Sequence, residues 1–366
     1  MGLLLSLLIT LAFIVYSAVK WKVSPVFTLF LAAIFMGISQ GLQPVFVVEK
    51  LLEGFGKTIA AIGFVIAFGT VIGVFLEKSG GTDVIAKKVL EKIPLKKSPL
   101  AMNLIGFVTS IPVFCDSGFV ILSALNRSLS KKTNIPHVVF AVALATGLYA
   151  THVFVPPTPG PLAAAAAMEA DIGLLMLVGL LLAIPVSLTG FFWAMLIKRK
   201  VVADEAPKET SYSGTGIENS FVTNNPLWKV LLPLMLPIVL IGFKSIINFP
   251  SKPIGEGTIF QVFDFIGNPV IALLLGVFIS VVSITSEENN MEKKQQWINH
   301  AFKEAGLIIL VTGAGGAFGA VLRELDLSDI IDPENGFIKN GLLLSFVLAA
   351  LLKTAQGSST VSIITT

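Results

Sequence analysis

The sequence predicts an all-α polytopic membrane protein with two inverted-topology repeats, broken helices and re-entrant hairpins, whose C-terminal part is missing. Composition is the first reason: 54% of the 366 residues are hydrophobic and 13% are charged, whereas soluble domains carry about 25% charged residues. The second reason is that the apolar residues come in runs of membrane-spanning length. The third is that the two halves of the chain resemble each other.

Composition also excludes several classes of function. One cysteine and three histidines exclude a disulfide framework and disfavour a cysteine- or histidine-built metal centre, so we expect no metal and no cofactor. A net charge of +3 without a basic stripe does not suit a protein that binds nucleic acid. The expected surroundings are the lipid bilayer.

The expected helices follow the apolar runs in order. These runs are residues 2–19, 25–42, 59–76, 100–125, 137–155, 172–197, 227–247, 269–284, 305–322 and 342–352. The first run has no charge and spans roughly 27 Å, close to the ~30 Å hydrocarbon core. It lacks a preceding basic segment, so we interpret it as a retained helix and not a signal peptide. Proline and glycine interrupt many runs, which membrane helices tolerate where the freed backbone groups are buried in protein or line a cavity.

An internal repeat relates the two halves. A shift of 246 residues brings Gly69 onto Gly315 and Thr82-Asp83 onto Ser328-Asp329. Chance similarity between apolar helices is the alternative, but the Thr/Ser-Asp match lies outside the apolar pattern. The predicted domains are a first repeat at 1–200 with a hairpin near 100–126, a cytoplasmic linker at 201–225 and a truncated second repeat at 226–366.

Charge predicts that the repeats are inverted. The loop at 77–97 carries six lysines and three acids, whereas its counterpart at 323–339 carries two basic residues and five acids. The positive-inside rule therefore places the first loop in the cytoplasm and the second outside. The cations at 127–132 stay inside only if residues 100–126 turn back near 112–118, which gives five crossings plus one re-entrant hairpin. An odd number of crossings inverts the second half, an architecture of secondary transporters.

The second repeat is shorter than the first. Only nine residues follow Gly357, whereas roughly 80 follow its counterpart Gly118 before the first half closes. We therefore expect about 70 residues to be missing from a chain of about 440. A natural short form is the alternative.

Four segments resemble the gluconate permease family of proton-coupled sugar-acid carriers. They are residues 68–81, Ile111-Pro112-Val113-Phe114-Cys115-Asp116-Ser117-Gly118-Phe119-Val120, His152-Val153-Phe154-Val155-Pro156-Pro157-Thr158-Pro159-Gly160-Pro161 and Ala355-Gln356-Gly357-Ser358-Ser359-Thr360-Val361. The resemblance implies a multi-pass symporter of the bacterial inner membrane, within the broader ion-transporter superfamily. It further implies two hairpins that meet at a central site, and a homodimer. The family includes carriers for gluconate, related hexonates, glycerate and D-serine.

The two hairpin breaks are the candidate substrate site. Free N–H groups at broken helices carry positive partial charge, and hydroxyls bind both carboxylates and sugar hydroxyls. The alternative is that these small residues merely allow tight helix packing. The candidate substrate-binding residues are Ser117, Gly118, Thr151, His152, Gln356, Gly357, Ser358, Ser359 and Thr360.

Asp116 and His152 are the candidates for proton coupling. A carboxylate inside an apolar run is costly and usually functional. Asp116 could instead hold a sodium ion or cap the outgoing helix. His152 precedes a proline-rich break and could relay a proton, or bond structurally to a freed carbonyl.

These observations favour a transporter over an enzyme or a channel. No nucleophile–base–orienter set is visible. The glycine-rich segment Gly313-Ala314-Gly315-Gly316 lacks the Gly-Lys-Ser/Thr of a phosphate loop, so helix packing is the favoured interpretation. Inverted repeats with paired hairpins argue against a passive channel. The predicted function is proton-coupled uptake of a small hydroxylated monocarboxylate, with gluconate first and D-serine or glycerate as alternatives; sodium coupling stays open.

Overall fold

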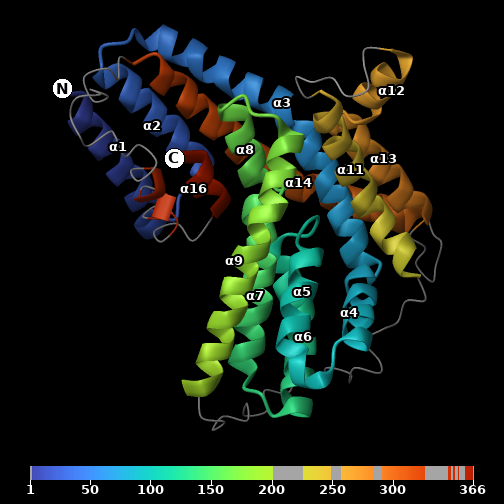
Figure 1. The fold of residues 1–366 in the computed structure, drawn as a ribbon. Helices are drawn as coiled ribbons and strands as arrows, with labels where there is room; N and C mark the ends of the chain where they lie inside the picture. Colours follow the sequence, from blue (N-terminus) through green and yellow to red (C-terminus); the bar gives the residue numbers. More distant parts are fainter. Residues whose placement is uncertain are drawn as a thin grey trace. The chain divides into compact units, whose positions relative to one another are not determined.

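A computed structural model describes residues 2–200, 226–248, 257–283 and 291–325, together with 345–347, 349–350, 353 and 359–365. All regular secondary structure within these residues is helical (Figure 1). Within the described ranges, five helical spans are long and apolar enough to cross a membrane, one of them the combined span His137–Ala167, or six if one bent pair counts as a single span. The prediction of an all-α polytopic membrane protein is thus confirmed. The expected linker at 201–225 and most of the run at 342–352 lie outside the described residues.

The helices follow the predicted order, with breaks where proline and glycine gather. They are α1 (Leu3–Tyr16), a π-helical turn (Ser17–Trp21), α2 (Pro25–Ser39), α3 (Pro44–Lys78), α4 (Gly81–Lys92), a 3₁₀ turn (Leu95–Lys97), α5 (Ser98–Thr109), α6 (Cys115–Thr133), α7 (His137–Phe154), α8 (Pro159–Ala167), α9 (Ile172–Lys200), α11 (Leu227–Ile247), α12 (Thr258–Ile266), α13 (Pro269–Ser283), α14 (Met291–Arg323) and α16 (Ser359–Thr365).

Two helices are much longer than the apolar runs that predicted them. The runs at 59–76 and 305–322 form only the C-terminal parts of α3 and α14, which have 35 and 33 residues. At 35 residues α3 is ~52 Å long, more than the ~30 Å hydrocarbon core requires. Its charged first half is helical because one apolar stripe is sufficient for packing, and Val47 and Leu51 on that stripe are buried.

Matched helix bounds agree with the predicted repeat. A shift of 244 residues carries the bounds of α2 onto 269–283, which are the bounds of α13. A shift of 246 carries the bounds of α3 onto 290–324, one residue beyond each end of α14. The repeat and its inversion stay a prediction.

The chain divides into two compact units, each of which draws segments from both halves. The first unit comprises Met1–Ile66, Pro159–Ala170 and Ala305–Thr366, and the second comprises Ala67–Thr158 and Asp171–Glu304. The units therefore cut across the predicted repeats at 1–200 and 226–366, as interwoven repeats would allow. Those repeat boundaries stay a prediction.

Glycines let α3 and α14 approach closely in the first unit. A Cβ on Gly54 would lie 2.5 Å from the carbonyl oxygen of Gly316, and a Cβ on Gly313 would lie 2.6 Å from the ring of Phe55. The N-terminal half of α3 thus packs antiparallel to the C-terminal half of α14. The glycine-rich segment at 313–316 lies inside this helix, which agrees with the packing interpretation and not with a phosphate loop.

A buried asparagine joins three helices of the second unit. Asn103 on α5 donates to the carbonyl of Ala143 on α7 at 3.0 Å and to the carbonyl of Ser187 on α9 at 3.3 Å. The hydroxyl of Ser187 donates back to Asn103 Oδ1 at 2.9 Å. Figure 1 shows these three helices running alongside one another. Because both side chains are buried, each polar group is satisfied only while the three helices stay in register.

We expect Asn103→Leu to destabilise the protein by about 1–3 kcal/mol, since it leaves the buried hydroxyl of Ser187 without its acceptor. Denaturant unfolding in detergent micelles measures the change. Asn299→Leu is the matched control, because Asn299 is exposed on α14 and surface changes lie within about 0.5 kcal/mol. Equal stability of the two variants would contradict the assigned role.

Asp83 gives the stability a predictable pH dependence. It lies in the first turn of the amphipathic helix α4, where burial raises the pKa of its carboxyl group from 3.8 to about 6. Between these values the folded state binds more protons than the unfolded state, so stability falls as pH rises through this window. We expect Asp83→Asn to melt like the wild type near pH 4 and at a higher temperature above pH 6. A temperature difference that does not change with pH would contradict this assignment.

Candidate functional site

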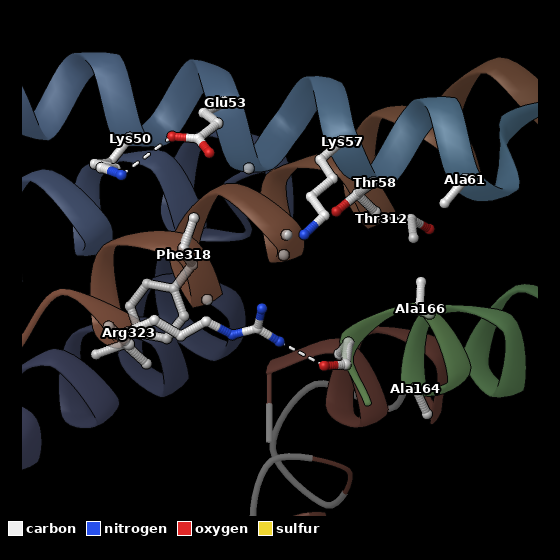
Figure 2. Close-up of a pocket in the computed structure, with 18 of the residues that line it drawn as sticks. Lys50, Glu53, Lys57, Thr58, Ala61, Ala164, Ala166, Thr312, Phe318 and Arg323 are labelled. Atoms are coloured by element: carbon white, nitrogen blue, oxygen red, sulfur yellow. Dashed lines mark hydrogen bonds and ion pairs between the residues drawn. The ribbon is translucent and has the colours of Figure 1, made fainter. Parts of the chain in front are cut away.

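A charged cavity lies in the first unit, between α3, α8, α14 and α16 (Figure 2). Its volume is about 330 Å³, near the lower end of the ~300–1,000 Å³ typical of small-molecule sites. The ionisable residues that line it are Lys50, Glu53, Lys57, Arg323 and Glu324. Three cations and two carboxylates inside one small hollow are unusual for a chain with so few charges.

Helix geometry places these side chains together. Lys50, Glu53 and Lys57 are three and four residues apart on α3, so they share one face of the helix. Arg323 is the last residue of α14. The antiparallel packing of the two helices brings this end of α14 beside the charged half of α3.

Lys50 forms ion pairs with both carboxylates that line the cavity. Its Nζ lies 3.2 Å from Glu53 Oε2 and 2.9 Å from Glu324 Oε1. The side chain of Lys50 is 26% exposed, so the pairing links α3 to the end of α14 in a partly shielded place. Glu53 is 65% exposed, so its contact contributes little by itself.

Lys57 and Arg323 have weaker partners. Lys57 Nζ lies 3.7 Å from Glu169, and these two side chains are 72% and 73% exposed; such a pair contributes little. Arg323 donates to the backbone carbonyl of Ala167 at the end of α8. Figure 2 shows the amino group of Lys57 and the guanidinium of Arg323 extending into the same space.

Small residues and hydroxyls complete the lining. A Cβ on Gly319 would meet nothing within 4 Å, so this glycine opens the wall of the cavity. Thr58 and Thr312 supply hydroxyl groups. Cations, carboxylates and hydroxyls in one hollow can bind a small polar anion through several kinds of hydrogen bond. Among the described residues, no group of three His, Cys, Asp or Glu side chains is placed to hold a metal ion.

The first predicted hairpin break is present, but it is shorter than expected. The chain leaves α5 after Thr109 and enters α6 at Cys115, so Ser117 and Gly118 lie in the first turn of a helix and not in an open tip. The reason is packing: a Cβ on Gly118 would lie 2.8 Å from Leu148, and its N–H already bonds to the carbonyl of Phe114 at 2.9 Å.

Asp116 is exposed in the same first turn. The N-cap of α6 is Phe114, and no side chain caps the helix there. The structure thus disagrees with the helix-capping alternative for Asp116, because that alternative requires the helix to begin at Ser117 and it begins two residues earlier, at Cys115. The proton and sodium alternatives remain proposals.

The structure brings His152 to this break. Its ring lies 6.1 Å from the ring of Phe114 in an edge-to-face arrangement. Thr151 is buried, and its hydroxyl donates to the carbonyl of Phe107 on α5 at 3.0 Å, which ties α7 to α5. As predicted, the prolines end the helix here, since α7 stops at Phe154 and α8 starts at Pro159.

The described part of the second predicted break, Ser359 and Thr360, lies in the first unit. Gln356, Gly357 and Ser358 lie outside the described residues, whereas Ser359 and Thr360 begin the short helix α16. A Cβ on Gly160 would lie 3.7 Å from Thr360 Cα, so α16 packs on α8. The predicted meeting of the two breaks joins residues of different units and stays a prediction.

Comparison with known proteins identifies the family. The family model described as "GntP family permease" matches residues 2–366. This chain belongs to the GntP permease family. The family resemblance seen in the sequence is therefore confirmed, and the chain is a transporter and not an enzyme.

Three relatives illustrate the similarity. An "Uncharacterized permease" of Haemophilus influenzae is 34% identical over 99% of this chain and 76% of its own length. A D-serine transporter, DsdX, of Escherichia coli K12 is 31% identical over 98% of this chain and 80% of its own. A "Gluconate permease" of Pseudomonas aeruginosa is 28% identical over 99% and 80%. With several apolar helices as well, this GntP-family permease is a multi-pass protein of the bacterial inner membrane.

Sequence reasoning missed the charged cavity of this permease. Lys50 and Lys57 precede the apolar run at 59–76, so the expected helix does not include them. A signal was available, because Pro44 at a helix start is followed by apolar residues at helical spacing, among them Val47 and Leu51. Lys57 and Arg323 are 266 residues apart in the chain, so no local sequence pattern predicts that they line one cavity.

Proposed function

We propose that this permease carries out proton-coupled secondary active uptake of a small hydroxylated monocarboxylate, with gluconate or a related sugar acid as the solute. The observation that carries the proposal is similarity along nearly the whole chain to a protein named gluconate permease. The cavity of the first unit supports it, since it offers cations to a carboxylate and threonine hydroxyls to the hydroxyls of a sugar acid.

A D-serine or glycerate carrier is the second candidate. A relative named as a D-serine transporter is 31% identical to this chain. D-Serine carries an ammonium and a carboxylate group, and a cavity with both signs of charge suits such a zwitterion as well as a polyhydroxy acid.

The proposal assigns roles to the residues of the two breaks. Asp116 and His152 carry the coupling proton, with sodium as the alternative ion. The protein works as a homodimer. The substrate-binding residues in this proposal are Ser117, Gly118, Thr151, His152, Gln356, Gly357, Ser358, Ser359 and Thr360.

Uptake of labelled gluconate into proteoliposomes tests this function. An inward proton gradient is imposed without sodium, and unlabelled D-serine and glycerate serve as competitors. We expect accumulation that a protonophore abolishes. If only D-serine or glycerate accumulates, gluconate is not the solute. If accumulation requires sodium, the coupling ion is sodium and not the proton. Transport of none of the three would overturn the proposal.

A further inference from the structure

The charges of the cavity do not balance once its internal ion pairs are formed. Three cations and two carboxylates line the cavity, a net charge of +1, and Lys50 pairs with both Glu53 and Glu324. Lys57 on α3 and Arg323 on α14 are the two cations that pair with neither lining carboxylate, and their charged ends extend into the same space (Figure 2). This excess of positive charge favours the binding of an anion in the cavity.

Both cations can turn to a ligand at little cost. The partner of Lys57 is Glu169, at 3.7 Å and in a strongly exposed pair, so breaking that contact loses little. A guanidinium has five N–H donors, and the bond from Arg323 to the carbonyl of Ala167 uses one of them. A planar fork of donors together with an ammonium in the same cavity suits a carboxylate group.

The predicted topology puts this cavity on the outer side of the membrane. Lys57 lies just before the apolar run of α3, and Arg323 lies just after the apolar run of α14. The lysine-rich loop that follows α3 is predicted to be cytoplasmic, so the N-terminal half of α3 points outward. The antiparallel packing of α14 in the same unit places Arg323 at that end too.

We infer that this cavity is the outward-facing site that first binds the carboxylate group of the solute, with Lys57 and Arg323 as its cationic ligands. The inference rests on the proposed function, because it names the solute as a carboxylate. Thr58 and Thr312 face the hydroxyl-bearing end. A solute molecule that arrives from outside would bind here before it crosses the membrane.

Binding to the purified protein tests the ligands without requiring transport. Labelled gluconate, D-serine and glycerate are titrated in a scintillation proximity assay, with unlabelled gluconamide as an uncharged competitor that keeps the hydroxyls. We expect Lys57→Gln and Arg323→Gln each to weaken binding of the carboxylate about 10- to 100-fold, because each removes a charge-assisted hydrogen bond. The preference of the wild type for the acid over gluconamide shrinks by the same factor, which a merely structural role would not produce.

A second pair of variants tests the cavity itself. Gly319→Leu fills the hollow, whereas Gly306→Leu places the same side chain on α14 outside it; neither added Cβ meets another atom within 4 Å. We expect the first to abolish binding and the second to leave it unchanged. Lys96→Gln, on an exposed turn far along the chain, is the control for loss of a lysine.

The outcomes separate this inference from the proposed function. Normal transport with unchanged binding in Lys57→Gln, Arg323→Gln and Gly319→Leu would overturn the inference alone. Binding that these variants weaken, in a protein that does not accumulate solute, would support the site and overturn the proposed transport. A wild type that neither binds nor transports any of the three acids would overturn both.

Labelling tests the outward orientation. Lys57→Cys is made in a Cys115→Ser background, which removes the one native thiol. We expect a membrane-impermeant maleimide to label it from the periplasmic side, and gluconate to slow the reaction. Labelling only in inside-out vesicles would overturn the orientation.

Discussion

Asp116→Asn is expected to abolish accumulation of solute against a gradient while solute exchange across the membrane continues. Asparagine keeps the shape of aspartate, but its side-chain amide cannot bind and release a proton near neutral pH. A proton gradient of one pH unit can drive about tenfold accumulation in a 1:1 symporter, since a factor of ten corresponds to about 1.4 kcal/mol. The variant should reach equal concentrations on both sides and go no further.

Proteoliposomes separate the two activities of this variant. Accumulation is measured under an inward proton gradient, and exchange is measured by counterflow without one. Glu91→Gln is the matched control, because Glu91 lies on the exposed face of α4 beside Lys88, outside the apolar runs. Normal accumulation by Asp116→Asn, or the loss of exchange together with accumulation, would show that Asp116 is not the coupling group.

Gly73→Ala is expected to have the largest effect on folding of any single methyl group added to α3. A Cβ at this position would overlap the carbonyl oxygen of Pro112, in the break between α5 and α6. Backbone atoms cannot rotate out of the way as a side chain can, so the break or the helix must shift. Overpacking of this kind costs about 1–3 kcal/mol and occasionally more.

Gly56→Ala on the same helix is the control, since its Cβ would meet nothing within 4 Å. There alanine should be neutral or stabilising, because glycine is about 1 kcal/mol worse than alanine inside a helix. Thermal unfolding in detergent and the yield of monodisperse protein measure both variants. If Gly73→Ala unfolds at the same temperature as Gly56→Ala, the close approach of α3 to the break does not stabilise the fold.

The sequence alone was sufficient for the apolar parts of most helices and for the breaks near Pro112 and at 156–161. Long apolar runs must be helical in a membrane, because backbone groups there have no water to bond. The prolines at 156–161 and Pro112 lie where helices are interrupted, since proline removes a backbone donor; α9 and α11 nevertheless continue through single prolines. The family motifs at 111–120 and 152–161 also lie at these breaks, so the sequence pointed to the region around Asp116 and His152 as well.

The tertiary structure decided what those local rules leave open. No local sequence pattern shows that Gly118 lies in a helix and packs against Leu148. Nor does the apolar pattern show that the charged residues before the run at 59–76 extend α3 by four turns. The cavity of Lys57 and Arg323 is the clearest case, because it exists only where two helices distant in sequence cross antiparallel. Backbone hydrogen bonding and apolar length act within one segment, so a sequence expresses them directly. Close approach and charge pairing act between segments, and only their packing settles which side chains meet.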